Sequence, residues 1–316
     1  MTLLTTFQEY AALRLAPSHV TMGSFDGVHL GHARLIEAMV ASARAEVAPA
    51  VVVTFFPHPS VVLRGRQPAL YITTVEEKAQ LLHLQGADHV ISLRFDQALA
   101  AVTASDFLQR MLTELRMRRL FIGEDFALGH GREGTRHFLE QHSLEGGFQV
   151  EVIPPLQIDG EVVSSTRVRE SLRSGDVARV RRYLGRPLII PGRVMRGAGR
   201  GRRLGIPTAN LEIWDERAYP GGGVYACWAE VAGKRWPSVT NIGFRPTFEE
   251  DTPRPIIEAH LLDFDHDLYD QEMRLVFIER LRDERRFNGP EALLEQIARD
   301  IGRARTMLAS EVGDHG

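Results

Sequence analysis

The chain has 316 residues, of which 44% are apolar, so it is long enough to form two globular cores. Its 38 basic and 41 acidic side chains leave a formal net charge of −3, which argues against a protein that mainly coats nucleic acid or acidic membranes. Small molecules are therefore the expected partners. Only Lys78 and Lys234 are lysines, and neither lies in a Gly-x-x-x-x-Gly-Lys pattern, so the sequence excludes a Walker-type phosphate loop.

The one cysteine, Cys227, can form no disulfide within the chain and cannot hold zinc alone, which fits a reducing compartment. It lies in an apolar strand pattern, so we expect a buried core residue rather than a catalytic thiol. No stretch approaches the length needed to span a bilayer, and the N-terminus has no leader pattern. The expected location is the cytoplasm.

The first half of the chain alternates short apolar runs with helical patterns. Strands are predicted over residues 19–22, 50–55, 89–93, 119–122 and 149–153, and helices over residues 31–46, 74–84 and 104–115. The second strand is a continuous apolar run, which is typical of a strand buried on both faces of a parallel sheet. Repeated strand-helix units predict an α/β doubly wound domain, whose ligands bind at the carboxyl ends of the strands.

A connecting region follows this domain. Residues 156–163 are predicted to form a small hairpin around Asp159-Gly160, a dipeptide that tolerates the positive φ angles of a type I′ turn. Two short helices come next, and the second ends near Gly185. We place the domain boundary just beyond, which gives a first domain over residues 1–186 and a second over residues 187–316.

The pattern changes in the second domain. Strands are predicted over residues 188–194, 223–231, 238–242, 256–263 and 273–278, with turns and no helices between them. This pattern predicts a small antiparallel β-barrel or sandwich. From Pro290 the helical period returns, so we expect a C-terminal helix that packs on the barrel.

The run Met-Gly-Ser-Phe-Asp-Gly-Val-His-Leu-Gly-His at residues 22–32 follows the first predicted strand. Its glycines let the backbone close on phosphate oxygens, and the amides that open the next helix attract anions. His29 and His32 can then donate to the charge that develops on an attacked phosphorus. A bare His-x-x-His pair is more often a pair of capping or solvated histidines, and zinc lacks a third ligand here. The position after a buried strand favours an enzyme that acts on ATP or a close relative.

Two motifs resemble the nucleotidyltransferase superfamily. Residues 29–32 match its His-x-Gly-His signature, and residues 164–169, Ser-Ser-Thr-Arg-Val-Arg, match its Ser-Ser-Thr-x-x-Arg element. The second motif alone could be an ordinary helix cap with a solvated arginine. The resemblance implies an ATP site in which the two histidines hold the α-phosphate. The ATP-binding residues it implies are Gly23, Phe25, His29, His32, Ser164, Ser165, Thr166 and Arg169.

The second domain contains a loop rich in glycine and arginine. Residues 197–210 read Gly-Ala-Gly-Arg-Gly-Arg-Arg-Leu-Gly-Ile-Pro-Thr-Ala-Asn and resemble the glycine-rich loop and Pro-Thr-Ala-Asn motif of riboflavin kinases. From the residues alone, the arginines could also form a nucleic-acid contact or a solvated basic turn. Thr208 and Asn210 favour phosphoryl transfer, because hydroxyl and amide oxygens suit Mg²⁺.

Further motifs extend the resemblance over nearly the whole chain, which is similar to the bacterial bifunctional riboflavin kinase/FAD synthetase family. These motifs are residues 54–59, 123–126, 222–226, 241–248, 257–264 and 281–287. The family resemblance implies that the second domain phosphorylates riboflavin to FMN and that the first adenylylates FMN to FAD, with ATP as co-substrate and Mg²⁺ as cofactor. It implies Glu258 as the general base, Thr208 and Asn210 as Mg²⁺ ligands, Gly197, Gly199, Gly201, Thr208 and Asn210 as kinase ATP contacts, and His58, Asp125 and Arg282 as flavin contacts.

Two positions depart from the family pattern. Phe56 stands where an acidic residue commonly precedes Pro-His-Pro, and Ala127-Leu128 replaces the usual Arg-Phe. A charge-assisted hydrogen bond is worth about 1.5–3 kcal/mol, so we expect weaker substrate binding in the adenylylating domain. Two alternatives stay open: a nucleotidyltransferase for another phosphate-bearing acceptor with an accessory barrel, and an RNA-binding barrel protein. The expected partners are riboflavin, FMN and ATP, without nucleic acid or membrane, in a monomer or weak homo-oligomer.

Overall fold

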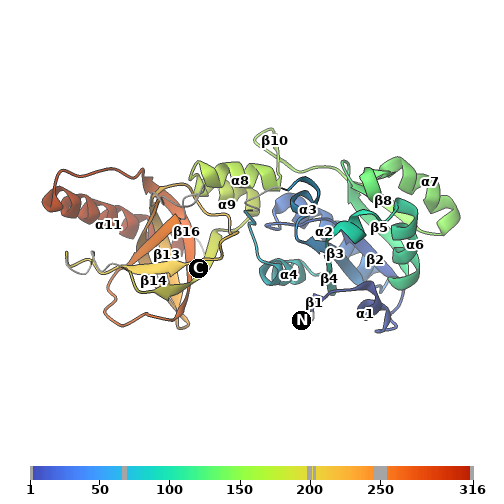
Figure 1. Ribbon diagram of the computed structural model, residues 1–316, viewed down its shortest axis with the longest axis horizontal. Helices are drawn as coiled ribbons and strands as arrows, with labels where there is room; N and C mark the ends of the chain where they lie inside the picture. Colours follow the sequence, from blue (N-terminus) through green and yellow to red (C-terminus); the bar gives the residue numbers. More distant parts are fainter. Residues whose placement is uncertain (1–2, 66–69, 198–200, 202–203, 245–254, 314–316) are drawn as a thin grey trace. The chain divides into compact units, whose positions relative to one another are not determined.

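A computed structural model describes residues 3–65, 70–197, 201, 204–244 and 255–313 (Figure 1). Its internal contacts divide the chain into two compact units, Met1–Ser165 and Thr166–Gly316. The first unit holds a six-stranded sheet in the order β1-β4-β3-β2-β5-β8, and every neighbouring pair is parallel. Its strands are β1 (Leu3–Leu4), β2 (Ser18–Met22), β3 (Ala50–Phe56), β4 (His89–Arg94), β5 (Met117–Gly123) and β8 (Gln149–Ile153).

The order of the strands creates a topological switch point between β2 and β5. From β2 the chain runs outward through β3 and β4, and it then returns to the other side of β2 with β5 and β8. In an open parallel sheet, ligands bind in the crevice beyond the carboxyl ends of the strands at such a point. The segments that follow β2 and β5 are therefore neighbours at this end of the sheet (Figure 1).

Helices cover both faces of the sheet, and two apolar clusters form the core of this unit. Val51 and Val53 of β3 pack in the cluster of α1 and α6, whereas Ala50 and Val52 pack in the cluster of α2 and α4. This alternation confirms that the strand is buried on both faces. The helices are α1 (Phe7–Ala11), α2 (Leu30–Ala45), α3 (Pro59–Arg64), α4 (Val75–Leu84), α5 (Gln97–Ala100), α6 (Ala104–Glu114) and α7 (Arg136–Gly146).

The region that follows β8 confirms the predicted hairpin and helices. Strands β9 (Gln157–Ile158) and β10 (Glu161–Val162) pair antiparallel around Asp159 and Gly160, whose φ angles of 53° and 78° are both positive, as a type I′ turn requires. Helices α8 (Ser165–Arg173) and α9 (Val177–Leu184) come next. The contact division falls at the start of α8 rather than beyond α9, because α9 packs on strands of the second unit. The assignment of residues 166–186 to the first domain therefore stays a prediction.

The second unit is a closed six-stranded barrel, which decides between the predicted barrel and sandwich. The strands follow the order β11-β12-β15-β14-β13-β16, with every pair antiparallel. They are β11 (Leu188–Met195), β12 (Ala209–Glu212), β13 (Gly223–Val231), β14 (Lys234–Phe244), β15 (Pro255–Leu261) and β16 (Glu272–Arg282). Strand β12 was not predicted, and β14 and β16 are longer than predicted, because each is completed by hydrogen bonds to neighbours distant in sequence.

Helix α11 (Pro290–Gly313) packs on the outside of β13, β14 and β16, as expected for the C-terminal helix (Figure 1). Val224 and Ala226 of β13 face Ala304 and Leu308 of the helix in one apolar cluster. Cys227, which follows Ala226 on the opposite side of the strand, is completely buried, and burial raises the pKa of its thiol to about 12. The cysteine is thus a core residue, as predicted.

Candidate functional site

The first site is the loop between β2 and α2, at the switch point of the parallel sheet. Gly27 has a φ of +83°, and a Cβ atom at this position would lie 2.9 Å from Cγ2 of Ile72. The buried carboxylate of Asp26 accepts hydrogen bonds from the backbone amides of Ile72 and Thr73 at 3.0 and 3.1 Å. A glycine and a buried acid therefore hold the loop in one conformation against the neighbouring segment.

His29 and His32 lie together at the start of α2, as the motif predicts. His29 is the N-cap residue, and its Nδ1 accepts a hydrogen bond from the amide of His32 at 3.3 Å. The two imidazoles stack with their centroids 3.5 Å apart, and Phe25 meets the edge of His32 at 5.0 Å. Because Nδ1 of His29 accepts this hydrogen bond, its ring carries a proton on Nε2.

Burial is the main reason that the pKa of His32 lies well below its usual value, and the nearby His29 and Lys78 lower it further. The imidazole is therefore neutral at pH 7. Its Nδ1 is buried and has no hydrogen-bond partner within the described part of the chain. An unpaired buried nitrogen at a helix N-terminus is suited to a phosphate ligand, since a neutral imidazole can present an N–H there.

The second motif meets this loop through its serines. The Ser165 hydroxyl donates to the backbone carbonyl of Asp26 at 2.8 Å, across 139 positions of sequence. A Cβ atom on Gly31 would lie 3.3 Å from the carbonyl oxygen of Val163, which precedes Ser164. The fold thus brings Ser164 and Ser165 to the histidine loop, and Thr166 and Arg169 follow on α8 in the other compact unit.

A groove of about 630 Å³ lies beyond β5, the neighbour of β2, and contains Asp125 as one of its lining residues. Two arginines, Arg132 and Arg136, line the same groove, and Arg132 donates to the backbone carbonyl of Asp125 at 2.8 Å. Guanidinium groups are therefore present where Ala127 departs from the family pattern. His58 lies elsewhere, as the N-cap of α3, and its Nδ1 accepts from the Ser60 amide at 3.1 Å.

The second site is a row of polar residues on the outside of the barrel. Asn210 of β12, Glu258 of β15 and Asn241 of β14 are direct partners across adjacent strands. Residues paired in this way have Cβ atoms about 4.5–5.5 Å apart on the same face. The flanking Ile257 and Ala259 are buried, so the row faces outward. Register alone therefore brings together residues from three separated segments.

Two cavities meet at this row. A cavity of about 590 Å³ is lined by Gly197, Asn210 and the connection between β15 and β16, and a second of about 310 Å³ lies against α11. The second is largely apolar, with Val224, Val239 and Phe287 in its wall. The residues that line both cavities are Thr208, Asn241, Glu258 and Glu284. A polar ligand and an apolar ligand could therefore meet at these four side chains.

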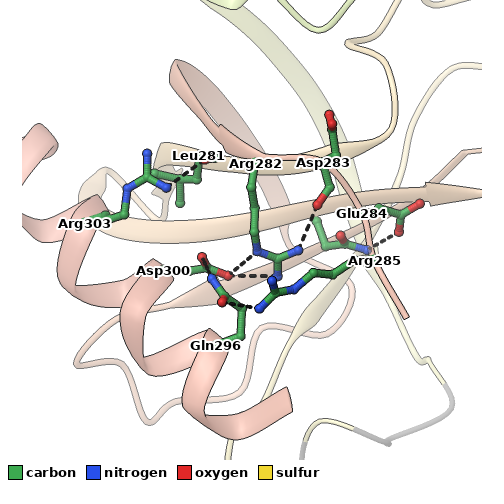
Figure 2. Close-up of polar contacts among 9 residues, drawn as sticks. Leu281, Arg282, Asp283, Glu284, Arg285, Gln296, Asp300 and Arg303 are labelled. Atoms are coloured by element: carbon green, nitrogen blue, oxygen red, sulfur yellow. Dashed lines mark hydrogen bonds and ion pairs between the residues drawn. The ribbon is translucent and has the colours of Figure 1, made fainter. Parts of the chain in front are cut away.

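Polar contacts connect the cavity wall to α11 (Figure 2). Arg282 donates to the Asp300 carboxylate from Nε at 2.9 Å and lies 2.8 Å from it through Nη2, and Asp300 is only 1% exposed. Gln296 donates to the other oxygen of Asp300 at 2.7 Å. Two residues beyond Arg282, the Glu284 carboxylate accepts a hydrogen bond from Asn241 Nδ2 at 3.2 Å. Arg282 therefore lines the apolar cavity while its charge is paired with the helix.

The structure describes only part of the glycine-rich loop. A Cβ atom on Gly197 would lie 2.2 Å from Nδ2 of Asn210, so the loop backbone packs directly on the polar row. Gly201 lines the apolar cavity, and Gly199 lies outside the described residues. Two arginines precede the loop: Arg193 pairs with Asp270 at 3.1 Å, and Arg196 stacks over the Tyr269 ring. The arginines of the loop itself, Arg200, Arg202 and Arg203, are not among the described residues.

Three side chains at these sites were not proposed as site residues from the sequence, although the motifs contained two of them. Asn241 and Glu284 lie in segments that match the family pattern, but only the register and the cavities show that they meet Glu258. Lys78 lies in a predicted helix with no motif of its own. It approaches the histidine loop only in the folded chain.

Comparison with known proteins identifies two families along the chain. The family described as FAD synthetase matches residues 13–167, and the family described as riboflavin kinase matches residues 184–308. The bifunctional riboflavin kinase/FMN adenylyltransferase of Pseudomonas fluorescens is 38% identical over 93% of this chain and 96% of its own. The protein of the same description from Bacillus subtilis is 35% identical over 90% of each.

A solved structure also matches. The crystal structure described as a macrolide-efflux protein from Streptococcus pneumoniae is 29% identical, with a TM-score of 0.83 over 92% of this chain and 95% of that chain. In the part of the present chain that is described, no helix has the length and apolar character needed to cross a membrane.

Proposed function

We propose two reactions for this chain, which belongs to the bifunctional riboflavin kinase/FMN adenylyltransferase family. In the barrel unit, the γ-phosphoryl group of ATP passes to the 5′-hydroxyl of riboflavin and forms FMN. In the α/β unit, the phosphate of FMN attacks the α-phosphorus of ATP, which forms FAD and releases pyrophosphate. The observation that carries the first assignment is the pair of cavities that meet at Glu258.

In the kinase reaction, the polar cavity holds the nucleotide and the apolar cavity holds the flavin ring. The ring is large and flat, and its dimethylbenzene part is apolar, which suits a wall that contains Val239 and Phe287. This arrangement directs the 5′-hydroxyl of riboflavin toward the shared side chains. Glu258 accepts the proton of that hydroxyl as its oxygen attacks the γ-phosphorus, a contribution worth about 10²–10⁴ in rate for a general base.

The oxygens beside Glu258 suit Mg²⁺. The Thr208 hydroxyl and the Asn210 amide supply hard oxygen donors next to the polar cavity. Among the described residues, no group of three His, Cys, Asp or Glu side chains could hold a metal, so the phosphates of the nucleotide would complete its ligands. Bound there, Mg²⁺ would neutralise charge on the transferring phosphoryl group. Asn241, oriented by Glu284, is the remaining polar neighbour of the hydroxyl.

In the adenylylation reaction, the histidine loop positions the α-phosphate of ATP. His29 and the neutral imidazole of His32 donate N–H hydrogen bonds to the oxygens that gain charge as FMN attacks. The hydroxyls of Ser164, Ser165 and Thr166, with the guanidinium of Arg169, bind the leaving pyrophosphate. Because the FMN phosphate is already an anionic nucleophile, this site requires no general base and forms no covalent enzyme intermediate.

The test is to incubate the protein with riboflavin, ATP and Mg²⁺ and to separate the flavins over time. FMN is expected first and FAD second. With His29 and His32 both changed to alanine, FMN accumulates; with Glu258→Ala, riboflavin stays unchanged while supplied FMN still becomes FAD. Each variant is the control for the other, because each leaves one reaction intact. Loss of both reactions in both folded variants would contradict the two-site assignment.

A further inference from the structure

Lys78 is a buried lysine beside the histidine loop. It lies in α4 and is only 5% exposed. Its ammonium donates to the backbone carbonyl of Ser24 at 3.1 Å and to that of Phe55 at 3.1 Å. Ser24 belongs to the loop that follows β2, and Phe55 lies near the end of the neighbouring strand β3. The lysine therefore joins the phosphate loop to the end of the sheet.

A neutral donor could make these hydrogen bonds, so the charge of Lys78 requires an explanation. Within the described residues, no carboxylate forms an ion pair with it, and the nearby Asp26 directs its own oxygens to the backbone of Ile72 and Thr73. A buried ammonium without a paired carboxylate costs stability. The Ser24 carbonyl also accepts from the Thr54 hydroxyl at 3.0 Å, so the loop has a second attachment that carries no charge.

The charge acts on the site itself. The ammonium is one of the causes that lower the pKa of His32, together with burial and His29. A positive charge near a neutral imidazole favours a negative ligand at the same site. The triphosphate of ATP and the phosphate of FMN are such ligands.

We propose that Lys78 is a positioning residue for adenylyl transfer, which attaches the loop of residues 23–29 to β3 and supplies a positive charge near His32. The inference rests on the adenylylation proposed above. Lys78 acts through the loop and through the histidines, and it makes no contact with the reacting atoms. Its charge adds to burial and to the nearby His29, which already hold the pKa of His32 low, so the imidazole serves as a neutral hydrogen-bond donor.

The proposal predicts a pH dependence for one reaction only. Burial lowers the pKa of Lys78 to about 8, while the charge of Asp26 opposes this shift. The titratable groups that act on the lysine from other elements are Asp26 in the loop and His32 on α2. Since the ammonium loses its proton as the pH rises through 8, adenylylation should fall on this alkaline side. Phosphorylation of riboflavin in the barrel should show no matching fall.

The experiment measures both reactions of the full chain between pH 6.5 and 10. In Lys78→Gln, kcat/KM for FAD formation should fall at least about tenfold at pH 7, mainly through kcat, and the alkaline fall near pH 8 should disappear. Lys78→Arg keeps a charge that does not titrate in this range, so its FAD formation should persist to higher pH. The matched control is Lys234→Gln, which removes the other lysine, an exposed residue of β14.

Circular dichroism shows whether each variant is folded, and riboflavin phosphorylation shows that the barrel unit is intact. The inference is wrong if the wild-type chain makes FAD but Lys78→Gln keeps its rate and its alkaline fall. It is also wrong if Lys78→Arg loses activity near pH 8 as the wild type does. This result tests the inference even if Lys78→Gln does not fold. If the wild-type chain itself makes no FAD from FMN, the proposed adenylylation fails instead.

Discussion

Replacing Asp300 by alanine is expected to destabilise the barrel unit strongly. The carboxylate is 1% exposed and accepts hydrogen bonds from Arg282 and Gln296 at 2.9 and 2.7 Å (Figure 2). Its removal leaves the guanidinium of Arg282, which is itself largely buried, without a counter-charge. Breaking one partner of a buried pair costs about 3–5 kcal/mol of unfolding free energy, a large part of a domain's total stability.

Tryptophan fluorescence makes the measurement specific to the barrel. All three tryptophans of the chain, Trp214, Trp228 and Trp236, lie in the second unit. Urea unfolding followed by their emission therefore reports the barrel, whatever the first unit does. The double variant Arg282→Met with Asp300→Leu should lose less stability than Asp300→Ala, because it leaves no unpaired buried charge.

An exposed ion pair on the same helix supplies the control. Arg305 of α11 pairs with Asp263 at 2.8 Å, but both side chains are exposed to solvent. Asp263→Ala should leave the unfolding midpoint unchanged within error, since exposed pairs contribute little. If Asp300→Ala shifts the midpoint no more than Asp263→Ala does, the reasoning from burial is refuted.

Three further outcomes are expected. Asn241→Ala should lower kcat for riboflavin phosphorylation by about tenfold, because the riboflavin hydroxyl loses the polar side chain that lies beside Glu258. FAD formation from FMN should not change, and an equal loss in both reactions would contradict this. Gly197→Ala should raise KM for ATP in the kinase reaction alone, since the added Cβ would displace Asn210, 2.2 Å away; an unchanged KM would show that the loop relaxes. The Cys227 thiol, whose pKa burial raises to about 12, should resist thiol reagents at pH 8 until the chain is unfolded in denaturant, and rapid labelling of the native protein would contradict its burial.

The elements that could be predicted depend on residues close together in the chain. The positive φ angles of Asp159 and Gly160 and the left-handed conformation of Gly185 follow from local steric preferences. The continuous apolar run of β3 indicated burial on both faces, which the two core clusters confirm. Helix α11 followed from its apolar period in the same way.

The missed strands β1 and β12 depend on distant partners. Strand β1 is two residues long and exists because β4 supplies its hydrogen bonds. Strand β12 has four residues, and β11 and β15 hold it from both sides. Segments this short carry too little pattern to be distinguished from loops.

The same distinction applies to the sites. His29 with His32 and Thr208 with Asn210 could be proposed from the sequence, because groups suited to phosphate or metal occur within a few positions of one another and match family motifs. The residues around them could not. Asn241 meets Glu284 across 43 positions, and Lys78 meets Ser24 across 54, so no local pattern indicates either contact. Arg282 was expected to contact flavin, and the fold adds that its charge is paired with Asp300.

The linear order of residues was thus sufficient to indicate the class of chemistry and the two-part organisation and to propose the main reactive groups, because the motifs for each lie in contiguous stretches. The folded chain was needed to show that Asn210, Glu258 and Asn241 form one row between two cavities. It was also needed to show that a buried lysine donates a hydrogen bond to the histidine loop. Strand register and side-chain packing depend on pairs of segments. Which segments become neighbours is settled only when the whole core is buried.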